Sequence, residues 1–237
     1  MWFYLWSNGQ TGNITPKVFP DPPTGYNEIE KIASSRTWVA PEDGYFKLIG
    51  LAQNGFAGRY GYIQGYDDVY YCGGGGGGGA GGITASQFTL KKGQIVEISV
   101  TGDISIRCGA EVATATAGEN GSDGKGTGQQ GYHGVGGYGG YGGSAQGGNI
   151  ANITGPAGGT GGISTGRDAS EAVGKVKAGY TATNTYEGYT TGGAYVVVLR
   201  GNTNLSMVQQ NAYDITDNSL EIAALAQEQT GLLLSLA

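Results

Sequence analysis

The sequence predicts an all-β fold: a β-sandwich with inserted glycine-rich helices of the polyproline-II (polyglycine-II) type and a short C-terminal helix. Glycine accounts for 49 of the 237 residues, and it gathers in the run 73–79 and in the stretch 118–162. Between Gly128 and Gly143 it recurs at every third position. Apolar runs with the composition of β-strands flank these tracts. These observations favour strands joined by ordered glycine insertions.

The three-residue glycine period fits neither an α-helix nor a β-strand, but it is the period of the polyproline-II helix. Glycine along one edge of such a helix removes every Cβ there, so a second extended segment can pack against it backbone to backbone. Collagen packs in this way but needs abundant proline, whereas Pro156 is the only proline between Gly73 and Gly193. We therefore expect several glycine-edged helices of one chain, side by side. The alternative is a disordered glycine linker.

Residues 1–35 are expected to be a lead-in or attachment segment. Prolines keep residues 17–24 extended, and residues 27–33 have the composition of a two-turn helix. An aromatic cluster near the start would either contact another chain or cover the open end of the sandwich. Its members are Trp2, Phe3, Tyr4 and Trp6.

The strand patterns delimit a domain over residues 36–201. Most of them alternate apolar and polar residues, as half-buried strands do. The run 194–199 is almost entirely apolar, so we expect it in the middle of a sheet with both faces covered. The expected strands are 37–39, 45–51, 83–90, 95–100, 104–108 and 194–199. The glycine tracts lie between them and would leave the sandwich as long insertions.

Residues 202–237 change composition sharply. Many strong helix formers lie in residues 219–237. They predict a helix that serves docking or oligomerisation. The alternative is a helix packed on the protein's own sandwich.

Little in the sequence indicates catalysis. His133 is the only histidine, which makes a metal site or a catalytic triad a poor interpretation. No Gly-Lys-Ser/Thr follows a glycine run, as a phosphate loop would require. Cys72 and Cys108 flank strands, which favours free thiols over a disulfide. We expect no enzyme, no cofactor and no metal.

The charge of the chain also limits the kinds of partner that we expect. The formal net charge is −6, which argues against nucleic acid and anionic membranes. No apolar run approaches ~18 residues, so membrane insertion is not expected. The N-terminus lacks the basic region and cleavage site of a secretory signal. We therefore expect synthesis in a cytoplasm.

Tyrosine provides the positive sign of function. The chain has 16 tyrosines against five phenylalanines, a bias towards surface recognition because tyrosine pairs a rigid apolar ring with a hydroxyl. Loops anchored at one end of a sandwich tend to cluster there. The tyrosine groups in the three loops 53–72, 109–162 and 175–191 would therefore form one surface. The alternative is that these rings merely cover the glycine helices. The candidate receptor-binding residues are Tyr66, Tyr70, Tyr138, Tyr141, Tyr186 and Tyr189.

Three stretches carry a resemblance to a known family. WVAPEDGYFKLIG (38–50) and the oligoglycine block followed by LKKGQIVEISVTG (90–102) resemble the glycine-rich domains of bacteriophage tail fibre and receptor-binding proteins. So does the closing GAYVVVLRG (193–201). The likeness covers roughly 36–201, and the glycine core is similar to that of T-even-type phage tip adhesins. In this group polyglycine helices pack as a sandwich, and distal loops choose the receptor.

The resemblance implies a tail fibre tip adhesin of the virion, synthesised in the host cytoplasm. Its expected partners are a host cell-surface receptor, either a glycan or an outer-surface protein, and other tail or fibre proteins. Homo-oligomerisation is a further possibility. Two rivals stay open: a structural or assembly component of the fibre that binds no receptor, and an enzyme acting on surface glycans.

Overall fold

The computed structural model describes residues 23, 25–65, 68–127 and 133–202. The chain divides into two units, of which Gly25–Gly201 holds almost all of these residues. This unit consists mostly of β-strands in several sheets, which agrees with the predicted all-β class. The expected C-terminal helix and the aromatic cluster near the N-terminus lie outside the described residues.

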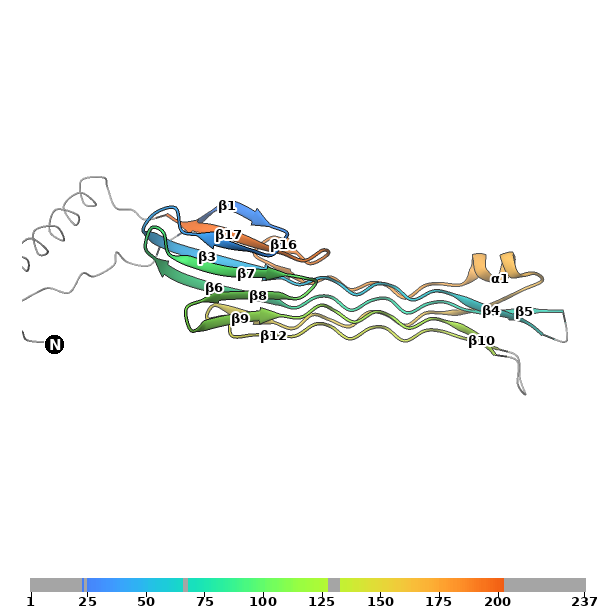
Figure 1. Cartoon of the computed structure of the whole chain (residues 1–237). Helices are drawn as coiled ribbons and strands as arrows, with labels where there is room; N and C mark the ends of the chain where they lie inside the picture. The colour runs from blue at the N-terminus through green and yellow to red at the C-terminus, as the bar shows by residue number, and fades with distance from the viewer. Residues whose placement is uncertain (1–22, 24, 66–67, 128–132, 203–237) are drawn as a thin grey trace, which may run out of the picture. The chain divides into compact units, whose positions relative to one another are not determined.

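Two five-stranded antiparallel sheets hold most of the hydrophobic core (Figure 1). Their strand orders are β1-β17-β3-β6-β13 and β12-β9-β8-β7-β2. The strands are β1 (Tyr26–Ile32), β2 (Arg36–Val39), β3 (Gly44–Leu51), β6 (Ile83–Leu90), β7 (Ile95–Val100), β8 (Ile104–Cys108), β9 (Glu111–Ala115), β12 (Ala145–Gln146), β13 (Ala151–Ile153) and β17 (Tyr195–Gly201). All six strands expected from the sequence are present within one or two residues of their expected limits.

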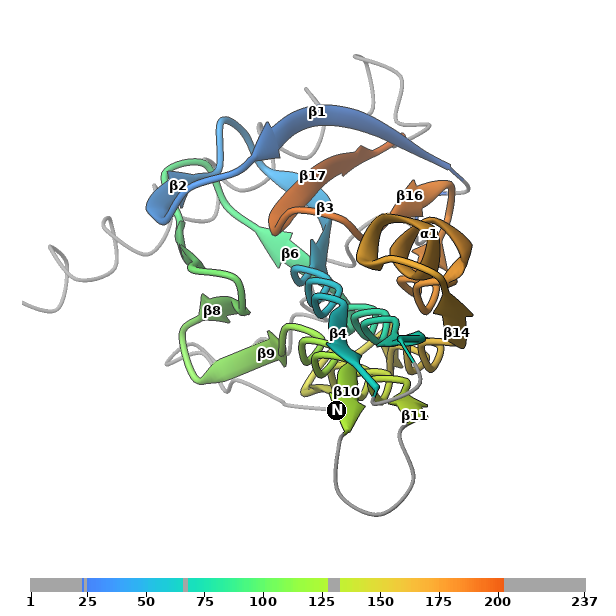
Figure 2. The same ribbon diagram turned by 90° about the vertical axis from the view of Figure 1, so that its right-hand side faces the viewer.

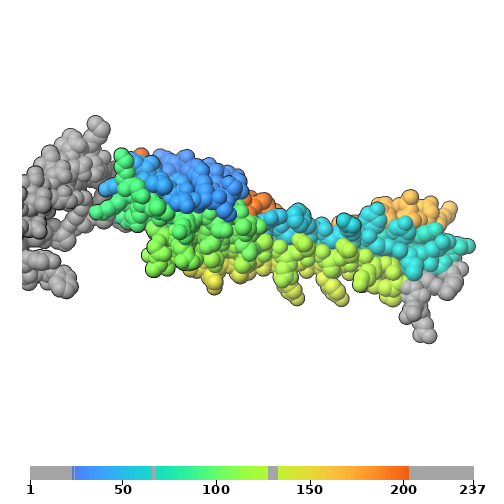
Figure 3. Space-filling view, viewed as in Figure 1, coloured from blue at the N-terminus to red at the C-terminus, as the bar shows by residue number. Residues whose placement is uncertain are grey.

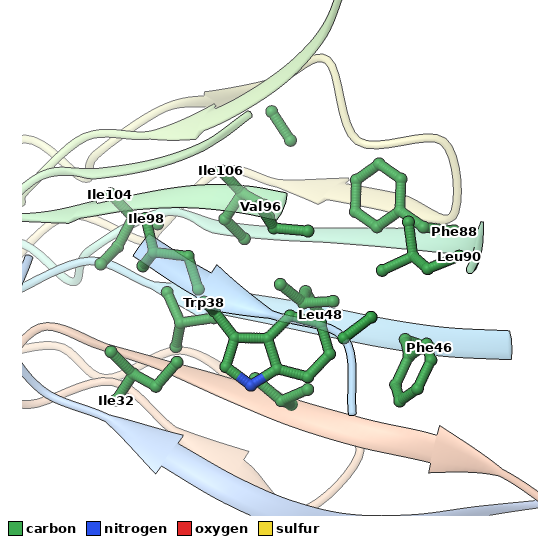
Figure 4. Close-up of a cluster of buried hydrophobic side chains, with 14 of the residues drawn as sticks. Ile32, Trp38, Phe46, Leu48, Phe88, Leu90, Val96, Ile98, Ile104 and Ile106 are labelled. Carbon is green, nitrogen blue, oxygen red and sulfur yellow. The ribbon is translucent and has the colours of Figure 1, made fainter. Parts of the chain in front are cut away.

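Buried side chains from both sheets form one hydrophobic cluster (Figure 4). Phe46 and Leu48 of β3 contribute from one sheet, and Trp38 of β2 and Ile106 of β8 contribute from the other. The rings of Trp38 and Phe46 meet edge to face, with centroids 5.2 Å apart. The alternation of apolar residues in these strands directs one face of each sheet into this shared core.

The strand β17 occupies the central position that its apolar composition predicts. It pairs with β1 on one side and with β3 on the other. Val196 and Val198 enter the cluster between the sheets, whereas Val197 and Leu199 belong to a second cluster on the opposite face. Both faces of β17 are therefore covered.

The helix predicted over residues 27–33 is wrong. These residues form β1, which pairs along its length with β17. Ile32 is buried while Glu28 and Glu30 are exposed or half-exposed, as on the edge strand of a sheet. Local helix propensity is a weak preference, and ladder hydrogen bonds with a strong apolar strand outweigh it.

The sheet register places the first and last residues of the unit's sheet at the same end of the strands. Tyr26, where β1 begins, pairs with Gly201, where β17 ends. At the other end of β17, Tyr195 pairs with Leu51, the last residue of β3. The chain therefore enters and leaves the sheet at the end opposite the point where it runs on from β3 into the first glycine segment.

Six extended segments continue from that second end of the sheets (Figures 1 and 2). They run alternately outward and back, and a turn region joins each outward segment to a returning one. They are residues 52–60, 74–82, 116–124, 136–144, 154–162 and 176–184. The three turn regions contain β4 (Gly61–Gln64) with β5 (Tyr70–Gly73), β10 (Lys125–Thr127) with β11 (His133–Val135), and β14 (Ile163–Gly166) with α1 (Ala169–Lys175).

Segment 74–82 lies at the centre of these six. Its N–H groups donate to different neighbours with a period of three residues. Those of Gly76 and Gly79 donate to carbonyls of segment 116–124 at 2.9 Å. Those of Gly74, Gly77 and Ala80 donate to carbonyls of segment 154–162 at 2.8–2.9 Å. This is the period that the glycine spacing predicts.

The carbonyl groups of segment 74–82 complete the arrangement. They accept N–H groups from segments 52–60, 136–144 and 176–184, again at every third residue. Five described segments are thus bonded to the central one, and they also bond to one another. The glycine tracts form an ordered hydrogen-bonded assembly, so the disordered-linker alternative does not hold for them.

Glycine is required in the central segment because its neighbours are in backbone contact. A Cβ placed on any residue from Gly74 to Gly79 would lie 1.9–2.3 Å from a backbone atom of an adjacent segment. For Gly76 that atom is the carbonyl oxygen of Tyr138, at 1.9 Å. No ordinary Cβ contact is that short, so any side chain would force the segments apart.

Polar side chains satisfy backbone groups at the borders of the assembly. Asn120 accepts the N–H of Phe56 at 2.7 Å, and Ser122 accepts the N–H of Tyr138 at 2.7 Å. Asn54 accepts the buried N–H of Gly81 at 2.9 Å. These side chains take the place of further backbone neighbours.

Both cysteines are free, as their positions beside strands predict. Cys72 is buried at the far end of the glycine segments, and Cys108 is half-buried at the end of β8. Burial raises the pKa of each thiol.

We expect Gly76→Ala to lower the free energy of unfolding by at least about 1–3 kcal/mol, the cost of overpacking a close contact. The matched control is Gly193→Ala, because a Cβ there meets nothing within 4 Å. The control should change stability by no more than ~0.5 kcal/mol. Denaturant unfolding of both variants measures this. Equal tolerance at the two positions would contradict the backbone-contact account.

Candidate functional site

The three turn regions meet at the end of the glycine segments remote from the two large sheets (Figure 1). We call this part, made of β4, β5, β10, β11, β14 and α1, the tip. Strands β14, β5 and β4 form one sheet, and β10 pairs with β11 beside it. A Cβ on Gly126 of β10 would lie 2.4 Å from the backbone of Ile63, and one on Gly134 of β11 would lie 2.1 Å from the carbonyl of Cys72. Stretches far apart in the sequence are therefore packed together here.

Aromatic and polar side chains of the β4–β5 turn are hydrogen bonded to one another. Tyr62 is 52% exposed, and its ring centroid lies 6.4 Å from that of half-buried Tyr70. The Tyr70 hydroxyl donates to Gln64 Oε1 at 3.0 Å, and Gln64 Nε2 donates to Asp68 Oδ1 at 3.3 Å. The candidate residue Tyr66 lies outside the described residues.

The helix α1 is an element of the tip that the sequence interpretation missed. Asp168 caps it by accepting the N–H of Glu171 at 2.8 Å, and Glu171 accepts the N–H of Arg167 at 2.7 Å. The spacing of Asp168 and Glu171 is that of a capping box, a signal that was legible in the sequence, although Glu171 bonds the N–H of the residue before the cap. The bond from Lys175 is the main cause that lowers the pKa of Glu171. Ala172 faces inward and is buried.

Tyr138 and Tyr141 lie on segment 136–144, between the large sheets and the tip. Each is 74% exposed. Figure 3 shows side chains of this yellow-green part of the chain projecting from the glycine segments. We call this pair the tyrosine ridge. The spacing of three residues puts both rings on the same edge of their segment.

Tyr186 and Tyr189 lie instead against one of the large sheets. They belong to the hairpin of β15 (Thr185–Tyr186) and β16 (Tyr189–Thr190). Both are half-buried against the cluster that contains Ile49 and Val197. The turn between them places Glu187 at φ 47°, and its carboxylate bonds the buried Lys47 ammonium at 2.6 Å. This hairpin covers the face of the sheet β1-β17-β3-β6-β13 that points away from the other large sheet.

The structure does not bring the candidate tyrosines together on one surface. Tyr70 belongs to the tip, Tyr138 and Tyr141 to the ridge, and the remaining described pair to the sheet. One ring fits the alternative that tyrosines merely cover the glycine segments. The ring of Tyr180 lies so close to Gly159 that a Cβ added to Gly159 would be 2.4 Å from it. Among the described candidate tyrosines, Tyr138 and Tyr141 of the ridge are exposed, whereas Tyr70 of the tip is half-buried beside the exposed Tyr62.

Neither a metal centre nor a membrane span is found among the described residues. No group of three or more His, Cys, Asp and Glu side chains in that part of the chain could hold a metal ion. None of its helices is long and apolar enough to cross a membrane. No family model, curated protein or solved structure matches the chain.

The environment of Tyr189 predicts a pH dependence. Its hydroxyl donates to Glu28 Oε2 at 2.7 Å, and burial together with this bond raises its pKa from 10.0 to about 12. Because the folded state holds the phenolic proton more tightly, the resulting stability is fully present below pH 10 and is lost as the pH rises towards 12. Tyr189→Phe should cost about 0.5–1.5 kcal/mol near neutral pH, as one lost hydrogen bond.

Chemical unfolding of the wild type and Tyr189→Phe between pH 8 and about 12 measures this. We expect the wild type to lose stability more steeply above pH 10, so that the two curves converge. Curves that stay parallel over that range would show that Tyr189 is not the titrating group.

Proposed function

We propose that Gly25–Gly201 is a β-sandwich bearing polyglycine-II helices, and that it acts as the receptor-binding tip adhesin of a bacteriophage tail fibre. Two observations support the architecture. The two large sheets share one core, and the glycine segments exchange hydrogen bonds with a period of three residues. The second is the expected period of side-by-side polyglycine-II helices.

The observation that carries the function is the direction of the unit. Tyr26 and Gly201, where the chain enters and leaves, are paired at one end of the sheet. The tip, built from three separate turn regions, lies at the other end of the six segments. A unit held by its chain ends would thus present its turns outward. Rigid scaffolds with exposed, variable turns are a common design for recognition.

The described turns offer chemistry suited to binding. They carry the exposed ring of Tyr62, amide and carboxylate groups, and the apolar side chain of Ile163, which is 66% exposed. Aromatic side chains with a polar tip are favoured in adaptable binding surfaces. We therefore place receptor contacts at Tyr70 of the tip and at the tyrosine ridge, and we keep Tyr66 as a candidate on the sequence alone; the proposed protein belongs to the virion and is not an enzyme.

The proposed partners are a host-surface glycan or protein at the tip and other fibre proteins near the chain ends. We assign docking or oligomerisation to residues 202–237. A purely structural component is the rival proposal, and it predicts no direct binding to cells. An enzyme that acts on surface glycans is a weaker rival, and it predicts release of carbohydrate from treated cells.

Competition for host adsorption tests the proposal. Full-length protein should adsorb to host cells and block adsorption of the phage that carries it. Tyr62→Ala and Tyr70→Ala should each weaken adsorption about fivefold or more, since hot-spot aromatics contribute over ~1 kcal/mol. The control is Ile95→Ala in β7, because Ile95 is similarly exposed at 54% and is not part of the tip. Protein that neither adsorbs nor competes would support the structural rival.

A further inference from the structure

The tyrosine ridge has a regular geometry on a fixed backbone. Tyr138 and Tyr141 are three residues apart, which in an extended helix of this type corresponds to about 9 Å along the axis. Their carbonyls accept the N–H groups of Ser122 at 2.9 Å and Glu119 at 2.8 Å, so both residues are anchored to the neighbouring segment. Both rings are 74% exposed. The result is two aromatic rings held at a set spacing on an open edge.

The surroundings of the ridge lack charge over a long stretch. No Lys, Arg, Asp or Glu occurs from Val135 to Gly162, which includes both the ridge segment and the segment 154–162 beside it. On the other side, segment 116–124 brings the exposed carboxylates of Glu119 and Asp123. An anionic ligand would meet repulsion there and would find no compensating cation on the ridge segment.

We propose that the tyrosine ridge binds an uncharged, linear oligosaccharide, with one sugar ring against each tyrosine. This inference rests on the proposed function and names the ligand class for one of its surfaces. The apolar C–H face of a sugar ring packs on an aromatic face, while its hydroxyls bond the phenolic groups and nearby polar side chains. The spacing of about 9 Å along the segment is longer than a single pyranose ring, so the two tyrosines would contact sugar rings that are not directly adjacent in an extended chain. A short or anionic sugar meets only part of this requirement.

Direct binding to purified glycans tests the ridge. Full-length protein is titrated with neutral linear oligosaccharides of increasing length, including cello- and chito-oligosaccharides and neutral chains from the host surface. Affinity should rise once the chain spans both tyrosines. Tyr138→Ala and Tyr141→Ala should each weaken binding about tenfold, with melting temperatures unchanged.

Tyr180→Ala is the matched control. Tyr180 is 70% exposed on another segment, but Lys177 and Thr183 occupy the positions three residues before and after it. Its removal should leave glycan affinity unchanged. Three results would overturn the inference: no binding of any neutral chain, equal binding by the variant lacking both ridge tyrosines, or tighter binding of uronic-acid chains of the same length.

Cell adsorption separates this inference from the proposed function. Suppose that the protein adsorbs to host cells, that protease treatment of the cells abolishes adsorption, and that no purified neutral glycan binds the ridge. The receptor is then a protein. The adhesin function then stands while the glycan inference fails. If the ridge binds neutral glycans but the protein adsorbs to no host cell, the ridge inference stands and the adhesin proposal fails.

Discussion

The hydrogen bonding of one segment, 74–82, in which every residue except Ala80 is glycine, determines how the rest of the unit is built. Ordering glycine costs more backbone entropy than ordering any other residue, and fixing a residue costs about 1–2 kcal/mol. A segment whose one side chain is the methyl group of Ala80 buries too little side-chain surface to offset this cost. It can do so through hydrogen bonds, each worth about 0.5–1.5 kcal/mol net, together with close backbone packing. Contacts with five neighbouring segments supply both the hydrogen bonds and the close packing. The glycines permit these contacts because they have no Cβ atom.

This constraint separates positions that must be glycine from positions that can carry side chains. Inside the assembly, positions in backbone contact tolerate only glycine, so they carry no chemical variety. Side chains can occur on outward edges, where Tyr138 and Tyr141 stand, and in the turns that join outward and returning segments. The two large sheets anchor the segments through ordinary hydrophobic packing. The chemistry of the unit is thereby concentrated on its outer edges and at the tip, where sequence can change without disturbing the scaffold.

Much of this organisation was predictable from periodicity. The strands around Leu48 and Val197 were legible because burial on one or both faces leaves a clear apolar pattern. The glycine period likewise favoured ordered glycine segments over a flexible linker. Other elements depended on distant partners. Residues 27–33 became a strand because β17 offers them a ladder, which no local pattern records.

The candidate site was less predictable for the same reason. Tyrosines look alike in sequence, and only the fold distinguishes an exposed ring such as Tyr141 from a half-buried one such as Tyr186. Asn54 could not be identified as the partner of Gly81 until the segments were in place. The helix α1 is different, since its capping residues Asp168 and Glu171 were visible in the sequence.

Residue-resolved amide hydrogen exchange across segment 74–82 tests the central claim most directly. Six of its N–H groups donate to backbone carbonyls of neighbouring segments, and that of Gly81 donates to Asn54. Those of Gly75 and Gly78 have no hydrogen-bond partner among the described residues. The account predicts strong protection of the hydrogen-bonded amides and faster exchange at Gly75 and Gly78. The exchange rates would then vary along the segment with a period of three residues. Rapid exchange throughout the segment, as in a flexible linker, or protection without that period, would contradict it.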